Sequence, residues 1–170
     1  INISQYQHIQ EKISEVIIAL ETLKAYVAAS EANAKLDKWG IMTPDFAPLN
    51  AARNYFPKIY PRFTEIMQLM GASGLMAIPS EEDFQSELRP DLDKYLQSAN
   101  GDAFNRVKLY RLAWDVCMSA FGSRQTLYER FFFGDPVRMA SALYSGYDKQ
   151  KYVDRVKEFL ERSEELQKTR

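Results

Sequence analysis

The sequence predicts an all-α protein, a bundle of four long helices accompanied by shorter ones. Apolar residues recur with helical spacing over many turns, both at the start of the chain and from about residue 102 onward. No stretch alternates polar and apolar residues for long enough to form a strand. The connections between the long segments are short, as in a helical bundle. With 170 residues, of which 46% are hydrophobic, the chain can bury the core of one ordinary domain.

The first predicted helix begins after Ser4, whose hydroxyl suits an N-cap, and continues to about Ala34. Charged residues occupy one side of this helix, which indicates a solvated face. Its apolar face consists of Tyr6, Ile9, Ile13, Val16, Ile17, Leu20, Leu23 and Val27.

Residues 37–50, DKWGIMTPDFAPLN, are predicted to form a loop because they contain one glycine and two prolines. Thr43 or Asp45 then caps the second long helix. Pro57 and Pro61 lie inside that helix, and each removes an amide donor, so the sequence predicts a break or kink near residues 54–60.

The second half of the chain continues with a glycine-containing break at residues 71–74 and with short helices that start near residues 79–82 and at Pro90. A long helix is expected from about Asp102 through residue 133, with the apolar face inside the bundle. Gly134 stops it, and Asp135-Pro136 is a start signal for the next helix. A charged helix over residues 151–170 ends the chain. The residues expected in the core include Ile17, Leu109, Leu112 and Val116.

Composition excludes several classes of function. The chain has 22 basic and 23 acidic residues, so no basic excess favours nucleic-acid binding. No segment is long and apolar enough to be a membrane span, and no signal peptide is visible. The single cysteine, Cys117, is typical of a cytoplasmic protein. The chain opens directly on a helical pattern at Ile1, without a methionine, which indicates a piece of a longer protein.

Most catalytic patterns are absent from the sequence. His8 is the only histidine and lies on a predicted helix surface, which argues against histidine-based triads and zinc sites. No Glu-x-x-His pair of a di-iron bundle occurs, and neither do the glycine-rich motifs that bind nucleotides. We therefore expect no catalytic residue and no metal ligand in this chain.

One stretch, residues 124–136, RQTLYERFFFGDP, has the composition of a ligand contact. The guanidinium of Arg124 suits phosphate oxygens, and the amides near Gly134, where a new helix starts, form a natural anion site. Three adjacent phenylalanines cannot all face one neighbour, because adjacent helical positions point about 100° apart. The alternative interpretation is that Arg124 pairs with a carboxylate and that the Gly-Asp-Pro sequence is only a turn.

Two segments resemble a known family. Residues 112–149, LAWDVCMSAFGSRQTLYERFFFGDPVRMASALYSGYDK, closely resemble the C-terminal part of the 4-hydroxyphenylacetate 3-monooxygenase oxygenase family. Residues 71–84, GASGLMAIPSEEDF, resemble an earlier segment of the same family. The order and spacing of the two segments fit, and the resemblance covers essentially the whole chain.

The resemblance implies the oxygenase component of a two-component, FAD-dependent aromatic monooxygenase. A separate flavin reductase supplies reduced FAD, which activates dioxygen to hydroxylate a phenol such as 4-hydroxyphenylacetate ortho to its hydroxyl group. The family fold is similar to that of acyl-CoA dehydrogenases, with an N-terminal helical domain, a middle β domain and a C-terminal four-helix bundle that assembles a tetramer. Residues 1–170 then form that single C-terminal domain.

For individual residues the resemblance implies FAD contact near the FFFGDP turn, at Phe133, Gly134, Asp135 and Pro136, with Arg124 adding charge toward the pyrophosphate. One or two of the three phenylalanines should fill the bundle core. The phenol-binding and catalytic groups belong to the other two domains, so this chain alone should bind FAD weakly or not at all. Replacing Gly134 with valine should weaken binding of reduced FAD in the complete protein, because a side chain would block close approach of the backbone.

Two other functions stay open at this point. The same broad fold houses a flavin-dependent 4-hydroxybutyryl-CoA dehydratase, which would need cluster-ligating cysteines that Cys117 alone does not supply. A non-catalytic helical assembly module is the other alternative. The sequence does not identify the phenol.

Overall fold

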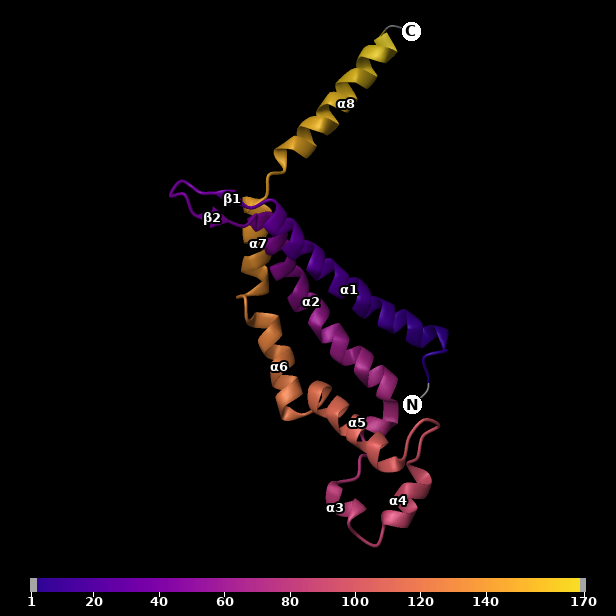
Figure 1. The fold of residues 1–170 in the computed structure, drawn as a ribbon. Coiled ribbons are helices and arrows are strands. Elements are labelled where there is room, and N and C mark those ends of the chain that lie inside the picture. The colour runs from indigo at the N-terminus through magenta and orange to yellow at the C-terminus, as the bar shows by residue number, and fades with distance from the viewer. Residues whose placement is uncertain (1–2, 169–170) are drawn as a thin grey trace.

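The computed structural model describes residues 3–168, so Ile1 and the last two residues of the predicted terminal helix lie outside it. Figure 1 shows an elongated, almost entirely helical molecule, which confirms the predicted all-α class. The elements in chain order are α1 (Gln7–Ala32), β1 (Lys35–Leu36), β2 (Met42–Thr43), α2 (Phe46–Gly71), η1 (Ala72–Leu75), α3 (Glu81–Phe84), α4 (Arg89–Tyr95), α5 (Ala103–Cys117), α6 (Ala120–Phe131), α7 (Pro136–Gly146) and α8 (Gln150–Lys168).

Helix α2 lies at the centre of the fold. It packs against α1 on one side and against α5, α6 and α7 on the other. Of the break or kink predicted near residues 54–60, the break is wrong, because α2 continues as one helix through Pro57 and Pro61. Packing along most of its length holds the helix together despite the amide donors that the two prolines remove. Asp45 caps this helix as predicted, by accepting a hydrogen bond from the amide of Ala47 at 2.9 Å.

The predicted long helix over residues 102–133 is also wrong, because it divides into α5 and α6. Ser119 forms the corner: its hydroxyl donates to the carbonyl of Asp115 at 2.7 Å and accepts from the amide of Gly122 at 3.0 Å. The serine therefore ends one helix and caps the next. The sequence did not predict this corner, because apolar residues with helical spacing continue on both sides of it. Asp102 caps α5 in the same way.

The first helix and the connection that follows it differ in detail from the prediction. Helix α1 has Tyr6, not Ser4, at its N-cap position. A short antiparallel hairpin, β1–β2, begins just before the predicted loop over residues 37–50 and continues into it, where no strand was predicted, and the last five residues of that range already belong to α2. Asp37 closes the hairpin tip by accepting hydrogen bonds from the amides of Trp39 and Ile41, both at 2.9 Å. Two-residue strands are too short to produce a detectable alternating pattern.

The buried core forms two neighbouring clusters beside α5. Leu75, Tyr110 and Cys117 form one, and Phe84, Ala103 and Val107 form the other. The prediction that Ile17, Leu109, Leu112 and Val116 lie inside is wrong: their side chains are 53%, 54%, 62% and 39% exposed. The apolar face of α5 is broad, and only its Val107–Tyr110–Cys117 side turns inward.

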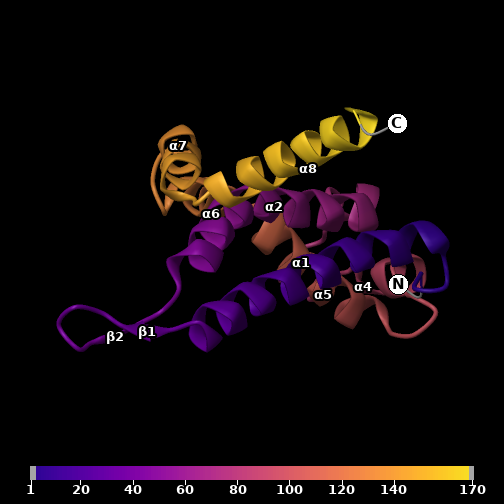
Figure 2. The ribbon, with the colours of Figure 1, turned by 90° about the horizontal axis from the view of Figure 1, so that it is seen from above.

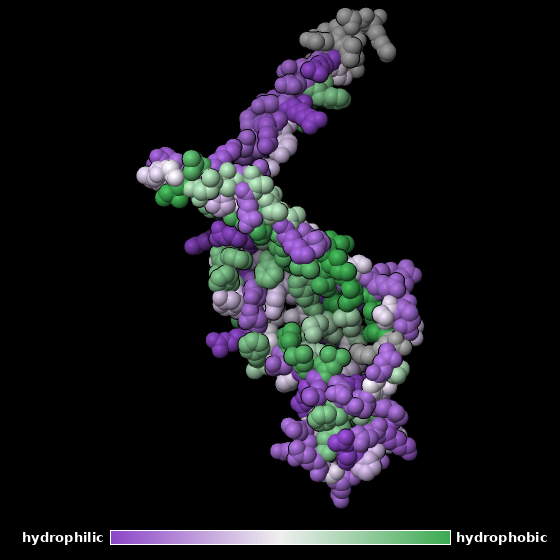
Figure 3. Space-filling model, viewed as in Figure 1, coloured by the Kyte–Doolittle hydropathy of each residue, from purple (hydrophilic) through white to green (hydrophobic). Residues whose placement is uncertain are grey.

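Much of the apolar surface is uncovered. Figure 3 shows a hydrophobic area over the middle of the body, between the hydrophilic α8 and the hydrophilic part that contains α3 and α4. Helix α8 projects away from the other helices (Figure 1). Figure 2 shows the same molecule from above. Its exposed apolar residues are Tyr152, Val153, Val156, Phe159 and Leu160.

A single cross-helix ion pair joins α1 to α2 among the described residues. Arg62 donates to both carboxylate oxygens of Glu15, at 2.7 and 2.9 Å, and also pairs with Glu65 on its own helix. The hydrogen bond from Arg62 is the main reason that the pKa of Glu15 lies below its ordinary value of 4.5. The pair fixes the register between α1 and α2 more than it adds stability, since both side chains are substantially exposed.

Candidate functional site

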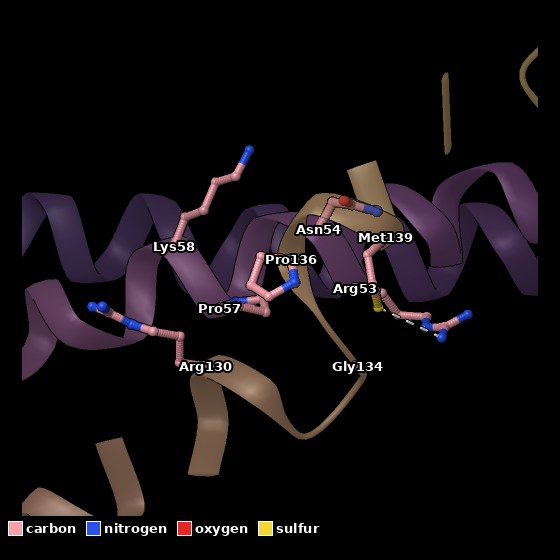
Figure 4. Close-up of a pocket in the computed structure, with 8 residues that line it drawn as sticks. All are labelled: Arg53, Asn54, Pro57, Lys58, Arg130, Gly134, Pro136 and Met139. Atoms are coloured by element: carbon pink, nitrogen blue, oxygen red, sulfur yellow. Dashed lines mark hydrogen bonds between the residues drawn. The ribbon is translucent and has the colours of Figure 1, made fainter. Parts of the chain in front are cut away.

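A cleft of about 410 Å³ lies between α2 and the turn that connects α6 to α7. Figure 4 shows Arg53 toward one end, Arg130 and Lys58 toward the other, and Pro57 and Pro136 close together between them. The complete lining consists of Arg53, Asn54, Pro57, Lys58, Arg130, Gly134, Pro136 and Met139.

The turn is shaped by local sequence. The amide of Gly134 donates to the carbonyl of Phe131 at 2.9 Å, and Gly134 has a φ of 122°, which residues with a side chain rarely adopt. Asp135 then caps α7 by accepting a hydrogen bond from the amide of Arg138 at 3.1 Å, and Pro136 takes the first helical position. The predicted helix start at Asp135-Pro136 is therefore confirmed.

Neutral groups hold Arg53 at the cleft wall. Its guanidinium lies 5.6 Å from the centre of the Phe133 ring. It also contacts the sulfur of Met139 at 3.9 Å and the side-chain oxygen of Asn50 at 3.4 Å. These contacts orient the guanidinium without neutralising its charge.

The cleft is electropositive. Arg53, Lys58 and Arg130 line it, and no acidic side chain does. Within residues 3–163, none of these three cations forms an ion pair; the pairs that exist involve Lys24, Arg62 and Arg89. The Asp135 carboxylate is nearby in sequence but is engaged at the start of α7. An uncompensated positive lining of this kind suits an anionic ligand.

The sequence-predicted site residues are only partly brought together. Gly134 and Pro136 line the cleft. Phe133 and Asp135 do not line it: the Phe133 ring contacts the guanidinium of Arg53, and Asp135 caps α7. Arg124 does not line this cleft; it lies in a separate surface hollow with Leu127, Tyr128, Phe131 and Phe132.

The three phenylalanines divide differently from the expectation that one or two fill the core. Phe131 and Phe132 are exposed, at 50% and 56%, and Phe133 is only half-buried. Their rings continue an aromatic row, with Phe132 5.0 Å from Tyr128 and 4.9 Å from Phe133. The last ring of the run carries Arg53, which gives Phe133 a specific contact at the cleft.

Sequence reasoning missed the α2 side of the cleft. Arg53 and Pro57 are four positions apart on α2, as are Asn54 and Lys58, so each pair follows along the helix and both pairs contribute to the cleft lining. The signal available was two basic residues on either side of a helix-interior proline. Nothing in the sequence alone indicates that this face meets a turn some 80 positions later.

Other kinds of site are not found in the described chain. No three His, Cys, Asp or Glu side chains in residues 3–163 gather as metal ligands, and none of the described helices is both long and apolar enough to cross a membrane. Tyr60, on α2, has its pKa raised by burial and then by the charge of Glu129 on α6, so its phenol stays neutral at physiological pH.

Comparison with known proteins identifies the family. The family model for the C-terminal part of 4-hydroxyphenylacetate 3-hydroxylase, HpaB, matches residues 1–161. The 4-hydroxyphenylacetate 3-monooxygenase oxygenase component of Geobacillus sp. (strain PA-9) is 55% identical over 161 residues, which are 94% of this chain and 33% of that protein. The Thermus thermophilus component of the same name is 51% identical over 158 residues, 93% of this chain and 33% of its own length. The chain thus spans about a third of the length of these relatives.

Solved structures agree. The HpaB oxygenase component complexed with FAD and 4-hydroxyphenylacetate superposes with a TM-score of 0.93 at 49% identity, covering 98% of this chain and 35% of that one. A 4-hydroxybutyryl-CoA dehydratase from N. maritimus, at 21% identity and a TM-score of 0.83 over 94% of this chain and 32% of its own, shares the fold. This chain therefore belongs to the family of the 4-hydroxyphenylacetate 3-hydroxylase C-terminal domain.

Proposed function

We propose that these residues are the C-terminal helical domain of the oxygenase component of a two-component, FAD-dependent monooxygenase that hydroxylates a phenol such as 4-hydroxyphenylacetate ortho to its hydroxyl group. The observation that carries the proposal is the close match, over 98% of the chain, to an oxygenase component solved with FAD and that phenol. Reduced FAD, supplied by a separate flavin reductase, would provide the chemistry with dioxygen. The lone buried Cys117 supports a reducing cytoplasm as the compartment.

Within that enzyme the domain would contribute to the cofactor site and to assembly. The cleft at Gly134 and Pro136 would contact FAD, while the catalytic and phenol-binding groups would come from residues outside this chain. Arg124, placed in a different hollow, would reach FAD only across an interface with other parts of the assembled enzyme.

The test is hydroxylation by the full-length protein that contains these residues. With a flavin reductase, NADH, FAD and dioxygen it should convert 4-hydroxyphenylacetate to the catechol, as followed by chromatography. The 170-residue chain under the same conditions should form no product. A full-length protein that binds FAD but hydroxylates no phenol of this type would contradict the proposal, and dehydration of a hydroxyacyl-CoA would favour the alternative enzyme.

We also infer that the chain forms a homo-oligomer, a tetramer in the full-length enzyme. Exposed large apolar residues occur on α1, α5, α6 and α8, and a lone copy would leave them in water. The Phe159 side chain on α8 is 71% exposed, so most of its ring lies in water in a lone copy. This surface, together with the apolar area on the body (Figure 3), supports association between copies.

Light scattering tests the association and the part of α8 in it. The chain should scatter with a mass that is a multiple of the monomer mass. Phe159→Gln should shift the population toward monomer, because it removes an apolar contact, whereas Glu158→Gln, at the adjacent exposed position, should not. A monomer at high protein concentration, or equal effects of the two substitutions, would contradict this role for α8.

A further inference from the structure

The loop between α4 and α5 contains a sequence that can modify itself. Asn100 is the only asparagine in the chain that a glycine follows. In an Asn-Gly sequence the backbone nitrogen of the glycine can attack the side-chain carbonyl carbon of the asparagine, because glycine has no side chain to obstruct the approach. Ammonia leaves and a cyclic imide forms. Water then opens the imide, either to aspartate or to isoaspartate, in which the main chain runs through the former side chain.

The structure leaves Asn100 available for this reaction. Asn100 and Gly101 are both exposed, in the short connection that follows α4 (Figure 1). The amide of Ser98 closes the turn by donating to the carbonyl of Gly101 at 3.0 Å. The attacking nitrogen, the amide of Gly101, contacts the carbonyl of Ser98 only at 3.5 Å. A hydrogen bond of that length is weak, so the nitrogen is free to turn toward the Asn100 side chain.

The other described asparagines are better protected. Three of them lie inside helices, where the backbone cannot rotate without breaking helical hydrogen bonds: Asn50, Asn54 and Asn105. Asn33 is exposed at the end of α1, but the residue after it is Ala34, whose methyl group obstructs the attack. The Ala34 amide also donates to the carbonyl of Glu31 at 3.1 Å. The chemistry therefore singles out Asn100.

The turn at Asn100 joins α4 to the core. Arg106 on α5 donates to the carbonyl of Leu96 at 3.1 Å, which ties the end of α4 to α5. Immediately after the turn, Asp102 caps α5 and Ala103, 1% exposed, enters the buried cluster. Isoaspartate would lengthen the main chain between these attachments, whereas aspartate would add only a negative charge near a helix N-terminus, where such a charge is favourable.

We propose that Asn100 is a site of spontaneous deamidation, and that its isoaspartate form loosens the start of α5 and its connection to α4. The reaction consumes water and releases ammonia, and it needs no cofactor or second protein. It does not depend on the hydroxylation proposed above.

The test is a time course of the folded full-length protein in neutral and alkaline buffer, followed by tryptic digestion and mass spectrometry. Trypsin cleaves after Lys94 and Arg106, so one peptide contains both Asn100 and Asn105. Asn100 should convert, and faster in alkaline buffer, because the attacking nitrogen must lose its proton. Asn105 should stay intact as the internal control. Equal conversion of the two, or conversion of Asn100 only after the protein is unfolded in urea, would overturn the inference.

Gly101→Ala is the matched variant. An added Cβ would lie 3.6 Å from the hydroxyl oxygen of Ser98, an ordinary contact, and Gly101 is not among the residues with positive φ, so the fold should be retained. Conversion of Asn100 should fall to the slow rate of Asn33 in the same sample. An unchanged rate in this variant would rule out attack by the Gly101 nitrogen.

Hydrogen exchange tests the effect on α5. After ageing, amides in the first turns of α5 should exchange faster than in fresh protein, because local opening becomes easier. Asn100→Asp, which has the charge without the longer main chain, should exchange like fresh protein. Aged protein that is largely converted but exchanges like fresh protein, or an equal increase in Asn100→Asp, would overturn the structural effect assigned to isoaspartate.

Discussion

Replacing Gly122 with alanine is expected to lower the free energy of unfolding by about 3 kcal/mol, in the upper range for overpacking a close-packed site. An added Cβ would lie 2.5 Å from the carbonyl oxygens of both Asp115 and Val116, a distance at which the carbon and oxygen atoms overlap. Both obstacles are backbone, so relief requires α6 to move away from the end of α5. That movement would also break the hydrogen bond from the Gly122 amide to Ser119.

Gly146→Ala is the matched control, since it adds the same atom at the last position of α7, with nothing within 4 Å. It should be neutral or slightly stabilising, because alanine favours a helix over glycine by about 1 kcal/mol at most. Urea denaturation of the two variants beside the parent chain measures both effects. Equal stabilities for the two variants would mean that α6 does not pack on α5 as closely as the structure has it.

The corner matters for function because α6 leads directly into the turn at Gly134. The direction in which α6 leaves Ser119 sets where Arg130, Gly134 and Pro136 meet α2. In the full-length protein, the folded fraction of a Gly122→Ala variant should therefore bind FAD less well than the parent, even though Gly122 does not line the cleft.

Local signals in the sequence predicted helix boundaries well. Asp45, Ser80, Asp102 and Asp135 all precede helices, and each side chain accepts a hydrogen bond from a backbone amide of the first turn. Such caps depend on a few adjacent residues, so sequence contains the information they need. The turn at Gly134 was identified for the same reason.

Contacts between residues that are far apart in the sequence could not be predicted from it. The α2 half of the cleft depends on Arg53 meeting Met139 and Phe133, residues about 80 positions apart, and periodicity contains no such pairing. The corner at Ser119 joins two helices whose apolar patterns are continuous, so the sequence predicted a single helix there. Amphipathic spacing identifies an apolar face but not the partner that covers it, which is why Ile17 and Leu112 were wrongly placed in the core.

The second large effect is on the free energy of unfolding, and it separates a buried leucine from one that periodicity wrongly placed in the core. Leu75→Ala should lower the free energy of unfolding by about 2–5 kcal/mol, the range for deleting a buried leucine. Leu75 is 2% exposed and packs with Tyr110 and Cys117, so its loss leaves a cavity that η1 and α5 cannot close. Leu112→Ala is the matched substitution on the opposite side of α5, where the leucine is 62% exposed.

In dilute solution Leu112→Ala should change the stability of the chain by about 0.5 kcal/mol or less, as exposed substitutions do. At high protein concentration its cost should rise, because the apolar face that includes Leu112 would then be covered by another copy, whereas the cost of Leu75→Ala should not depend on concentration. Thermal melts across a concentration series separate the two cases. A Leu112→Ala variant as unstable as Leu75→Ala in dilute solution would place Leu112 inside the single chain, as the periodicity of α5 first suggested, and would contradict an interface role for this face.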